Sequence, residues 1–368
     1  MGIFDQIGTM QHEQVVFCAD QESGLKAIIA IHDTTLGPSL GGCRFWNYAS
    51  EADALTDVLR LSRGMTYKAA VAGLSLGGGK AVIIGDPKKL KSEGLFRAFG
   101  RFVESLGGRY ISAEDVNVGV EDVENMALET QFVTGLATTS GGSGNPSPIT
   151  ALGNYHGIRA AVHHKLKRES LKDIRVAVQG CGSVGESLVE LLIEDKARVV
   201  ISDIDEQKVQ RLADKYRIEA IDTSRIHAAD VDVYAPCALG AVLNDDTIPQ
   251  LRASIVAGAA NNQLRDEDKH GNQLKSRGIL YAPDYVINAG GLINVYHELK
   301  GYHAEDARRQ TGRIFDTLLR VFTEADAEGI STHTASARIA ERRIATMTRV
   351  RGLRNRVGNQ TWIHRRLS

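Results

Sequence analysis

The sequence lacks the features that mark several large classes of protein. Its four cysteines, in 368 residues, stand far apart without a Cys-x-x-Cys pair, which argues against a disulfide scaffold and against a zinc ribbon. No apolar run reaches the roughly 18 residues of a membrane span, and the first residues show neither a signal peptide nor a myristoylation pattern. We therefore expect a cytoplasmic protein in a reducing compartment, with no membrane partner.

Net charge is also almost absent. The 44 Lys and Arg residues balance 45 Asp and Glu residues, so the formal net charge is −1 and nothing in the composition draws the chain to nucleic acid. The exception is residues 338–368, where nine arginines accompany a single acid, Glu341. Apolar residues recur there at near-helical spacing, which favours a helix with one packed face over a nucleic-acid-binding tail.

Glycine, in contrast, is abundant and clustered. The chain has 37 glycines, about 10% of its residues against a usual ~7%, and only 7 prolines. The glycines gather in short groups, such as Gly77–Gly79 and Gly290–Gly291, rather than being spread as in a flexible linker. Clusters of this kind let a backbone approach a ligand closely, so we expect small-molecule chemistry.

The apolar pattern of the first half predicts an α/β domain. Helices are expected over residues 50–66, where Ser50 is suited to cap the first turn, and over residues 95–106. Short apolar runs at 81–84 and 109–113 predict strands.

The second half shows the rhythm of a doubly wound parallel sheet, the Rossmann arrangement. Strand-like runs alternate with helical patterns or loops and occupy residues 174–179, 198–202, 231–235 and 254–257. A stretch rich in Gly, Ser and Pro at 138–148 reads as a hinge, and the chain after about residue 305 is helical and expected to pack back on the first domain. We predict two domains separated by a cleft, residues 1–135 with 331–368, and residues 136–330.

A G-x-G-x-x-G motif at residues 180–185 stands between a predicted strand and a predicted helix. A second strand follows, and Asp203 lies 18 residues beyond Gly185. The glycines permit a tight turn close to a pyrophosphate, and Asp203 is suited to accept ribose hydroxyls and to repel a 2′-phosphate. NAD is therefore predicted rather than NADP, against the alternatives of an ordinary glycine turn and a surface aspartate. The predicted cofactor residues here are Gly180, Gly182, Ser183, Val184, Gly185 and Asp203.

Two lysines and an aspartate form a second candidate group. Lys80 follows Gly77–Gly79 directly and opens an apolar run, where an unpartnered cation is penalised by burial. Lys68 precedes it in the segment GMTYKAA, and Asp115 ends the predicted strand 109–113. A Lys/Asp pair in a cleft beside a nicotinamide suits proton transfer during oxidation at a carbon that bears an amine. Taken singly, a lysine in such a position is more often a surface residue than a catalyst.

Several long motifs occur in order and together resemble the Glu/Leu/Phe/Val amino-acid dehydrogenases. They are GPSLGG (37–42), GMTYKAA (64–70), GLSLGGGKAVIIGDP (73–87), GGSGNPSPIT (141–150) and YAPDYVINAGGLINV (281–295). The resemblance covers nearly the whole chain and is strongest to the members that use leucine. It implies NAD-dependent oxidative deamination of a small L-amino acid to a 2-oxo acid with release of ammonium, by a homo-oligomer that is expected to be an octamer.

The resemblance also implies roles for individual residues. Lys80 would be the acid/base and Asp115 would shuttle protons, while Lys68 would hold the substrate carboxylate together with Asn288. Thr150 and Asn261 would lie by the nicotinamide end of the cofactor. The expected substrate pocket comprises Leu40, Gly41, Gly42, Met65, Ala113, Leu292 and Val295.

Three residues differ from those usual in the related enzymes, and two alternative functions remain. Gly185 stands where Ala is common, Cys43 where Thr is usual and Leu292 where Val is usual, and the last two bear on the preferred substrate. Branched-chain L-amino acids are the first expectation, and a phenylalanine, valine or tryptophan dehydrogenase is the alternative. A non-catalytic dinucleotide-binding regulator is the alternative of a different class. The 11 histidines form no HExxH or HxxxH pair, so no metal is predicted.

Overall fold

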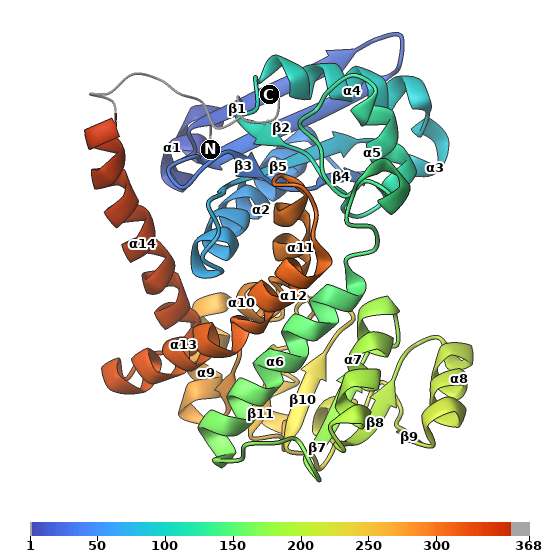
Figure 1. The fold of residues 1–368 in the computed structure, drawn as a ribbon, viewed down its shortest axis with the longest axis vertical. Coiled ribbons are helices and arrows are strands. Elements are labelled where there is room, and N and C mark those ends of the chain that lie inside the picture. Colours follow the sequence, from blue (N-terminus) through green and yellow to red (C-terminus); the bar gives the residue numbers. More distant parts are fainter. Residues whose placement is uncertain (1, 355–368) are drawn as a thin grey trace. The chain divides into compact units, whose positions relative to one another are not determined.

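The computed structural model describes residues 2–354, in which the chain forms two compact units (Figure 1). Unit 1 contains the chain up to Gly144, the short segment Glu298–Tyr302 and the chain from Ala340. Unit 2 contains Asn145–His297 and His303–Ile339. Both units are α/β, as predicted, and the chain passes between them four times.

Unit 1 is built on a mixed six-stranded sheet in the order β1-β2-β5-β3-β6, with β4 also paired to β5. The pairs β1–β2 and β2–β5 are antiparallel, whereas β3, β4, β5 and β6 pair in parallel. The strands are β1 (Gln14–Asp20), β2 (Leu25–Asp33), β3 (Ser39–Leu40), β4 (Cys43–Trp46), β5 (Gly77–Ile84) and β6 (Tyr110–Ile111).

The long helix α2 packs against this sheet. It begins after Ser50, whose hydroxyl accepts a hydrogen bond from the Asp53 backbone at 3.1 Å, and it continues to Val71, five residues beyond the predicted end. Its apolar face joins β2 and β5 in one buried cluster that includes Leu55, Leu59 and Val82. The helices of unit 1 are α1 (Ile3–Met10), α2 (Glu51–Val71), α3 (Pro87–Leu90), α4 (Glu93–Ser105) and α5 (Val120–Ala127), with a 3₁₀ turn at Thr138–Ser140.

Strand β5 begins at Gly77, four residues earlier than the sequence predicted. A Cβ on Gly77 would lie 1.9 Å from the Asp33 carbonyl oxygen, and one on Gly78 would lie 2.1 Å from the Thr66 backbone nitrogen. The glycines are therefore required because α2 and β2 approach this strand too closely for a side chain. In consequence, Lys80 lies inside the strand rather than at its start.

Unit 2 is built on a six-stranded parallel sheet in the order β12-β11-β10-β7-β8-β9. This is the predicted Rossmann arrangement, with the strand order reversing beside β7. The strands are β7 (Arg175–Gln179), β8 (Arg198–Ser202), β9 (Glu219–Ala220), β10 (Val233–Pro236), β11 (Ile255–Val256) and β12 (Leu280–Tyr281).

Helices cover both faces of the unit 2 sheet (Figure 1). Gly153 and Gly157 on α6 face the side chains of Ile287, Ile314 and Leu318, so this helix packs closely against α10 and α13. The helices are α6 (Ser147–Leu166), α7 (Ser183–Glu194), α8 (Glu206–Tyr216), α9 (Glu267–Ser276), α10 (Asp284–Ile287), α11 (Gly290–Glu298), α12 (Ala304–Gly312) and α13 (Ile314–Glu328), with 3₁₀ turns at Ile226–Ala228 and Ile248–Gln250.

The last described helix, α14 (Thr332–Arg354), begins in unit 2 and enters unit 1 at Ala340. Arg343 donates hydrogen bonds to the carbonyls of Ala70 at 2.7 Å and Leu74 at 2.8 Å, and so binds the end of α2. The expected packed face does not extend along the helix, because Met347 and Val350 are 39% and 50% exposed. The rest of the arginine-rich segment, 355–368, lies outside the described residues.

Glu298 holds the segment 135–143, which precedes the point where the chain first leaves unit 1. Its side chain is buried and accepts hydrogen bonds from the backbone N–H groups of Gly135 and Ser143, both at 2.9 Å. The Ser143 hydroxyl also donates to it. Between these two anchor points the chain makes the exposed turn 138–141. Within residues 2–354, no helix has the length and apolar character needed to cross a membrane.

Candidate active site

The structure brings Lys80 and Asp115 together in unit 1. Lys80 lies in β5 and is 6% exposed, and Asp115 follows the end of β6. The Lys80 Nζ is 2.8 Å from Asp115 Oδ2. The pair was predicted from chemistry and resemblance, but the fold supplies the geometry, because the two residues are far apart in sequence.

Gly41 and Gly42 make this approach possible. A Cβ on Gly41 would lie 1.8 Å from the Gly79 carbonyl oxygen, next to Lys80. A Cβ on Gly42 would lie 2.1 Å from the Glu114 carbonyl oxygen and 2.9 Å from the Asp115 Cβ. The glycine pair therefore fills the narrow space between β5 and the chain after β6, where any larger residue would push Lys80 and Asp115 apart.

Asp115 carries a second cation that the sequence analysis missed. The Arg44 Nε donates to the same Asp115 Oδ2 at 3.1 Å, and its Nη1 donates to Asp57 at 2.9 Å. Burial by itself would raise the pKa of Asp115, but the charges of Lys80 and Arg44 outweigh it and hold that pKa below its usual value. The sequence signal was a single arginine between buried Cys43 and Phe45 in the strand CRFW.

The other predicted substrate residues of unit 1 surround this pair or lie on α2. Leu40 is buried at the end of β3, next to the glycine pair, and Met65 approaches the Gly41 position, with its Cγ 3.4 Å from a built Cβ. Lys68 is half-buried one helical turn beyond Met65. Ala113 is buried, and its carbonyl accepts a hydrogen bond from the Cys43 backbone at 2.8 Å.

Unit 2 gathers a separate polar group. The Asn288 amide donates to Asn261 Oδ1 at 2.6 Å and to the Ala259 carbonyl at 3.1 Å. Its own Oδ1 is buried and has no hydrogen-bond partner among the described residues, so it is available to a ligand. Thr150 lies beside Gly291, with its hydroxyl oxygen 2.9 Å from a Cβ built there. Leu292 is buried and Val295 half-buried on α11.

The predicted cofactor residues of the glycine motif, Gly180 to Gly185, form the turn between β7 and α7. Gly180 has φ +109°, a conformation that side chains rarely adopt, and α7 begins at Ser183 with no side-chain cap from Gly182. A Cβ on Gly185 would lie 1.9 Å from the Gly180 carbonyl, so helix and turn pack closely. Space is open above Gly182, where nothing lies within 4 Å of a built Cβ. The uncapped start of α7 and this open space fit a pyrophosphate.

Asp203 connects this turn to the next strand. It follows β8, and its two carboxylate oxygens accept hydrogen bonds from the backbone of Cys181 at 2.6 Å and of Asp205 at 2.9 Å. A carboxylate offers about four lone-pair directions, so both bonds leave acceptor capacity for ribose hydroxyls. Asp203 therefore fits the predicted role and also orders the turn itself.

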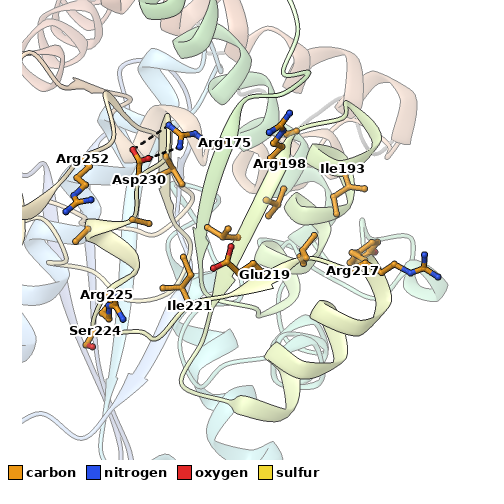
Figure 2. A pocket seen from close by; sticks show the side chains of 18 of the residues that line it. Arg175, Ile193, Arg198, Arg217, Glu219, Ile221, Ser224, Arg225, Asp230 and Arg252 are labelled. Atoms are coloured by element: carbon orange, nitrogen blue, oxygen red, sulfur yellow. Dashed lines mark hydrogen bonds and ion pairs between the residues drawn. The ribbon is translucent and has the colours of Figure 1, made fainter.

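A cavity of about 1000 Å³ lies at the opposite, amino-terminal edge of the same sheet (Figure 2). Arg175 and Arg198 open strands β7 and β8 there, and Arg175 is paired with Asp230 at 2.9 Å. Arg217 caps the carboxyl end of α8, where a cation offsets the negative end of the helix dipole. Because the glycine turn is at the carboxyl ends of the strands, this arginine-lined cavity is not part of the dinucleotide site.

Comparisons with known proteins identify the family of this chain. The model of the Glu/Leu/Phe/Val dehydrogenase dimerisation domain matches residues 12–132, and that of the Glutamate/Leucine/Phenylalanine/Valine dehydrogenase family matches residues 141–206 and 201–352. Leucine dehydrogenase of Bacillus subtilis is 53% identical over 351 residues, which are 95% of this chain and 96% of that protein. L-tryptophan dehydrogenase of Nostoc punctiforme is 50% identical over 344 residues, which are 94% of this chain and 96% of that protein.

A solved structure of an amino-acid dehydrogenase is similar to this chain in fold and in sequence. The crystal structure of L-tryptophan dehydrogenase from Nostoc punctiforme superposes with a TM-score of 0.85 at 48% identity, covering 95% of this chain and all of that one. Two family models together span most of the sequence, and the relatives match along nearly their full length. The chain belongs to the Glu/Leu/Phe/Val dehydrogenase family.

Proposed function

We propose that this protein is an NAD-dependent amino-acid dehydrogenase that converts branched-chain L-amino acids, namely leucine, valine and isoleucine, to 2-oxo acids and ammonium, and catalyses the reverse reductive amination. The observation that carries the proposal is the ion pair of buried Lys80 with half-buried Asp115 in unit 1. It accompanies a dinucleotide turn in unit 2 that Asp203 orders. A non-catalytic regulator would need the turn but has no use for a buried Lys/Asp pair.

In the proposed reaction the chain's own residues move protons. Bound NAD supplies the acceptor for the hydride that leaves the substrate Cα, and the amino acid becomes an iminium. Uncharged Lys80 takes a proton from the water that adds to the iminium carbon. Asp115, 2.8 Å from the Lys80 Nζ, would relay that proton from Lys80 to the nitrogen of the carbinolamine. Lys80, uncharged again, would then take the hydroxyl proton as the C–N bond breaks, so that ammonia leaves and the carbonyl forms.

The resemblance proposes Lys68 and Asn288 for the substrate carboxylate. Lys68 has the charge for that role, whereas the partner-free Oδ1 of Asn288 is an acceptor and suits the substrate amino group. Thr150 and Asn261 are proposed to flank the nicotinamide end of NAD. The side-chain pocket is proposed from apolar residues alone, which would leave the carboxylate of a glutamate substrate buried and unpaired. Its members are Leu40, Met65, Ala113, Leu292 and Val295, with Gly41 and Gly42 beside them.

A panel of L-amino acids, with NADH formation as the readout at alkaline pH, tests the substrate class. Leucine, valine and isoleucine are expected to be good substrates with shallow discrimination, because one methylene in an apolar pocket changes the free energy by only about 1–3 kcal/mol. Faster oxidation of phenylalanine or tryptophan than of leucine would favour the second candidate, an aromatic amino-acid dehydrogenase. That candidate has support in the 50% identity to L-tryptophan dehydrogenase.

The double variant Leu40→Gly with Val295→Ala tests the pocket itself. Removing both bulky side chains makes room for a ring, so the ratio of kcat/KM for phenylalanine to that for leucine should rise about tenfold or more. A ratio that does not move would mean that other residues line the pocket.

We also propose the division of labour between the two parts of the chain. Residues 1–135 with 331–368 would bind substrate and form the oligomer contacts, and residues 136–330 would bind NAD. The first family model is a dimerisation domain, and Phe17, 54% exposed on edge strand β1, supports association there. Light scattering on the purified protein tests the octamer, and fractionation of the source cells tests the cytoplasmic location.

A further inference from the structure

Arg44 belongs to the proton-transfer machinery by its geometry. Its guanidinium joins two carboxylates, donating from Nε to Asp115 Oδ2 at 3.1 Å and from Nη1 to Asp57 Oδ2 at 2.9 Å. The same Asp115 oxygen receives the Lys80 Nζ at 2.8 Å. One carboxylate oxygen therefore has two cationic partners, of which one is able to lose its charge and the other is permanent.

The guanidinium is fixed from the side remote from Lys80. Asp57 on α2 accepts a hydrogen bond from the Tyr48 hydroxyl at 2.6 Å as well as from Arg44. Arg44 itself stands in β4, between Cys43 and Phe45, which are fully buried. Strand, helix and tyrosine together set the position of the charge, so it does not follow Lys80 when that residue changes its protonation state.

A permanent charge is needed at this place because of what happens in the reaction cycle. If Lys80 were the sole partner of Asp115, loss of its proton would leave a buried carboxylate alone, and burial favours the protonated acid. A carboxyl group with a raised pKa would hold a proton that it accepts during the relay and would not pass it on. With Arg44 in contact, the carboxylate keeps a cationic partner throughout.

We propose that Arg44 is a positioning residue for the proposed dehydrogenase reaction: its fixed charge keeps Asp115 an oriented anion after Lys80 has given up its proton. The inference rests on the proposed function of the Lys80–Asp115 pair. It assigns to Arg44 no contact with substrate.

The remaining groups around Asp115 do not replace this charge. The Val116 backbone N–H donates to the carboxylate, which is a neutral contact. Burial raises the pKa of Cys43, of Tyr110 and of Tyr48, so these neighbours stay uncharged near neutral pH. Glu114, next in sequence, is an acid whose pKa is raised by burial and by Glu298. The charged and titratable groups that face or adjoin Asp115 are thus Lys80, Arg44, Cys43, Tyr48, Tyr110, Asp57 and Glu114.

The experiment compares the pH profile of kcat for the wild type, Arg44→Gln and Arg44→Lys, with NAD affinity and Tm measured on each. Removing a fixed positive charge makes the Lys80–Asp115 pair hold its proton more tightly, so the acid limb of the Arg44→Gln profile should move up by about one pH unit. Its kcat below the limb should fall about tenfold, with NAD affinity unchanged. Arg44→Lys keeps the positive charge, so the acid limb of its pH profile should stay in place. Its kcat should be lower, because an ammonium group lacks the planar guanidinium geometry that joins Asp115 to Asp57.

Arg101→Gln is the matched control, because Arg101 also pairs with a carboxylate in unit 1, Glu129 at 2.9 Å, but lies on the exposed face of α4. Its profile should coincide with that of the wild type. If Arg44 served only to tie β4 to α2, Arg44→Gln would lower Tm and leave the limb where it was, which overturns the proposal. If Arg44→Gln did not fold, a limb shift in folded Arg44→Lys would overturn it equally.

The proposed function fails separately from this inference. A wild type that oxidises no amino acid, or a fully active Lys80→Ala variant, would remove the reaction itself. A wild type that is active and a Lys80→Ala variant that is inactive, together with an unshifted Arg44→Gln profile, would remove only the role of Arg44.

Discussion

The two units build their candidate sites from different materials. In unit 1, side chains from separate elements meet, with Lys80 on β5, Arg44 on β4 and Asp115 after β6, and each charge is satisfied by the others. In unit 2, the candidate dinucleotide turn is formed by the backbone of Gly180–Gly182 and is held by one carboxylate, that of Asp203. A site of paired charges is sensitive to the loss of a member, because each carboxylate then loses a cationic partner. A backbone site depends on the absence of side chains.

Lys80→Ala should have the largest effect on turnover and none on the dinucleotide turn. General acid–base catalysis contributes about 10²–10⁴-fold, so kcat should fall by at least ~100-fold. Asp115 keeps Arg44 as a partner, so the fold and the affinity for NAD should be maintained. Steady-state kinetics and fluorescence titration with NADH measure the two quantities. Lys89→Ala, at a lysine whose side chain is 80% exposed, is the control, and a kcat similar to wild type in Lys80→Ala would contradict the mechanism.

Asp203→Ser should act on unit 2 alone. It removes the charge that opposes a 2′-phosphate, so the preference for NAD over NADP should narrow about tenfold or more. The kcat/KM for NAD should also fall, because Asp203 accepts the backbone N–H groups of Cys181 and Asp205.

The measurement for Asp203→Ser is the ratio of kcat/KM for the two cofactors. Asp205→Ser removes a nearby acid that caps α8, accepting from the Lys208 backbone at 3.2 Å, and should leave the ratio unchanged. An unchanged ratio of kcat/KM for NAD and NADP in Asp203→Ser would show that another residue binds the ribose and discriminates between the two cofactors.

A buried histidine pair in unit 1 should give the smallest effect at working pH and a clear one in acid. The rings of His12 and His32 pack edge to face, with their centroids 4.8 Å apart. His12 is hydrogen-bonded to Ser62 at 2.7 Å and His32 to Thr66 at 2.8 Å. Burial is the main cause that lowers the pKa of each from 6.5 to about 4; the second cause is the other histidine, His32, for His12 and the charge of Arg63 for His32. The unfolded chain therefore binds protons first, and the free energy of unfolding should fall as the pH drops from 6.5 to about 4.

The size of that fall follows from the shift. About 2.5 pH units correspond to roughly 3 kcal/mol for one histidine, and less than twice this for the pair, since the two are coupled. Urea denaturation across this range measures it, with His32→Gln expected to flatten the acid side of the curve. Equal pH dependence in the variant and the wild type would assign the acid sensitivity elsewhere.

Sequence reasoning succeeded best where the signal is contiguous. Strand β8 coincides with the predicted run 198–202, and the glycine turn lies where the G-x-G-x-x-G motif places it. All of that information lies within about 25 residues of chain, and the turn needs glycine for a local reason, the φ of +109° at Gly180.

Unit 1 was harder to predict because its site depends on contacts between residues that are far apart in the sequence. Glycine is disfavoured in strands, so propensity concealed the first four residues of β5, and only the crowding by α2 and β2 explains them. Arg44 was missed because its partners lie 13 and 71 residues away. The exposure of Met347 and Val350 was missed as well, because the periodicity of a helix shows which residues share a face and not how far its neighbours extend along it.

Glu298 gives the protein a closed loop without a covalent crosslink. Gly135 and Ser143 are both held by one carboxylate, so the eight-peptide arc between them starts and ends at the same anchor, and the turn at 138–141 projects from it into solvent. Lengthening such an arc alters neither anchor, and the added entropy of closing a longer loop grows only logarithmically. This turn is therefore the place in the chain where a peptide tag or a fluorescent reporter would be accepted while the strands of both units keep their registers.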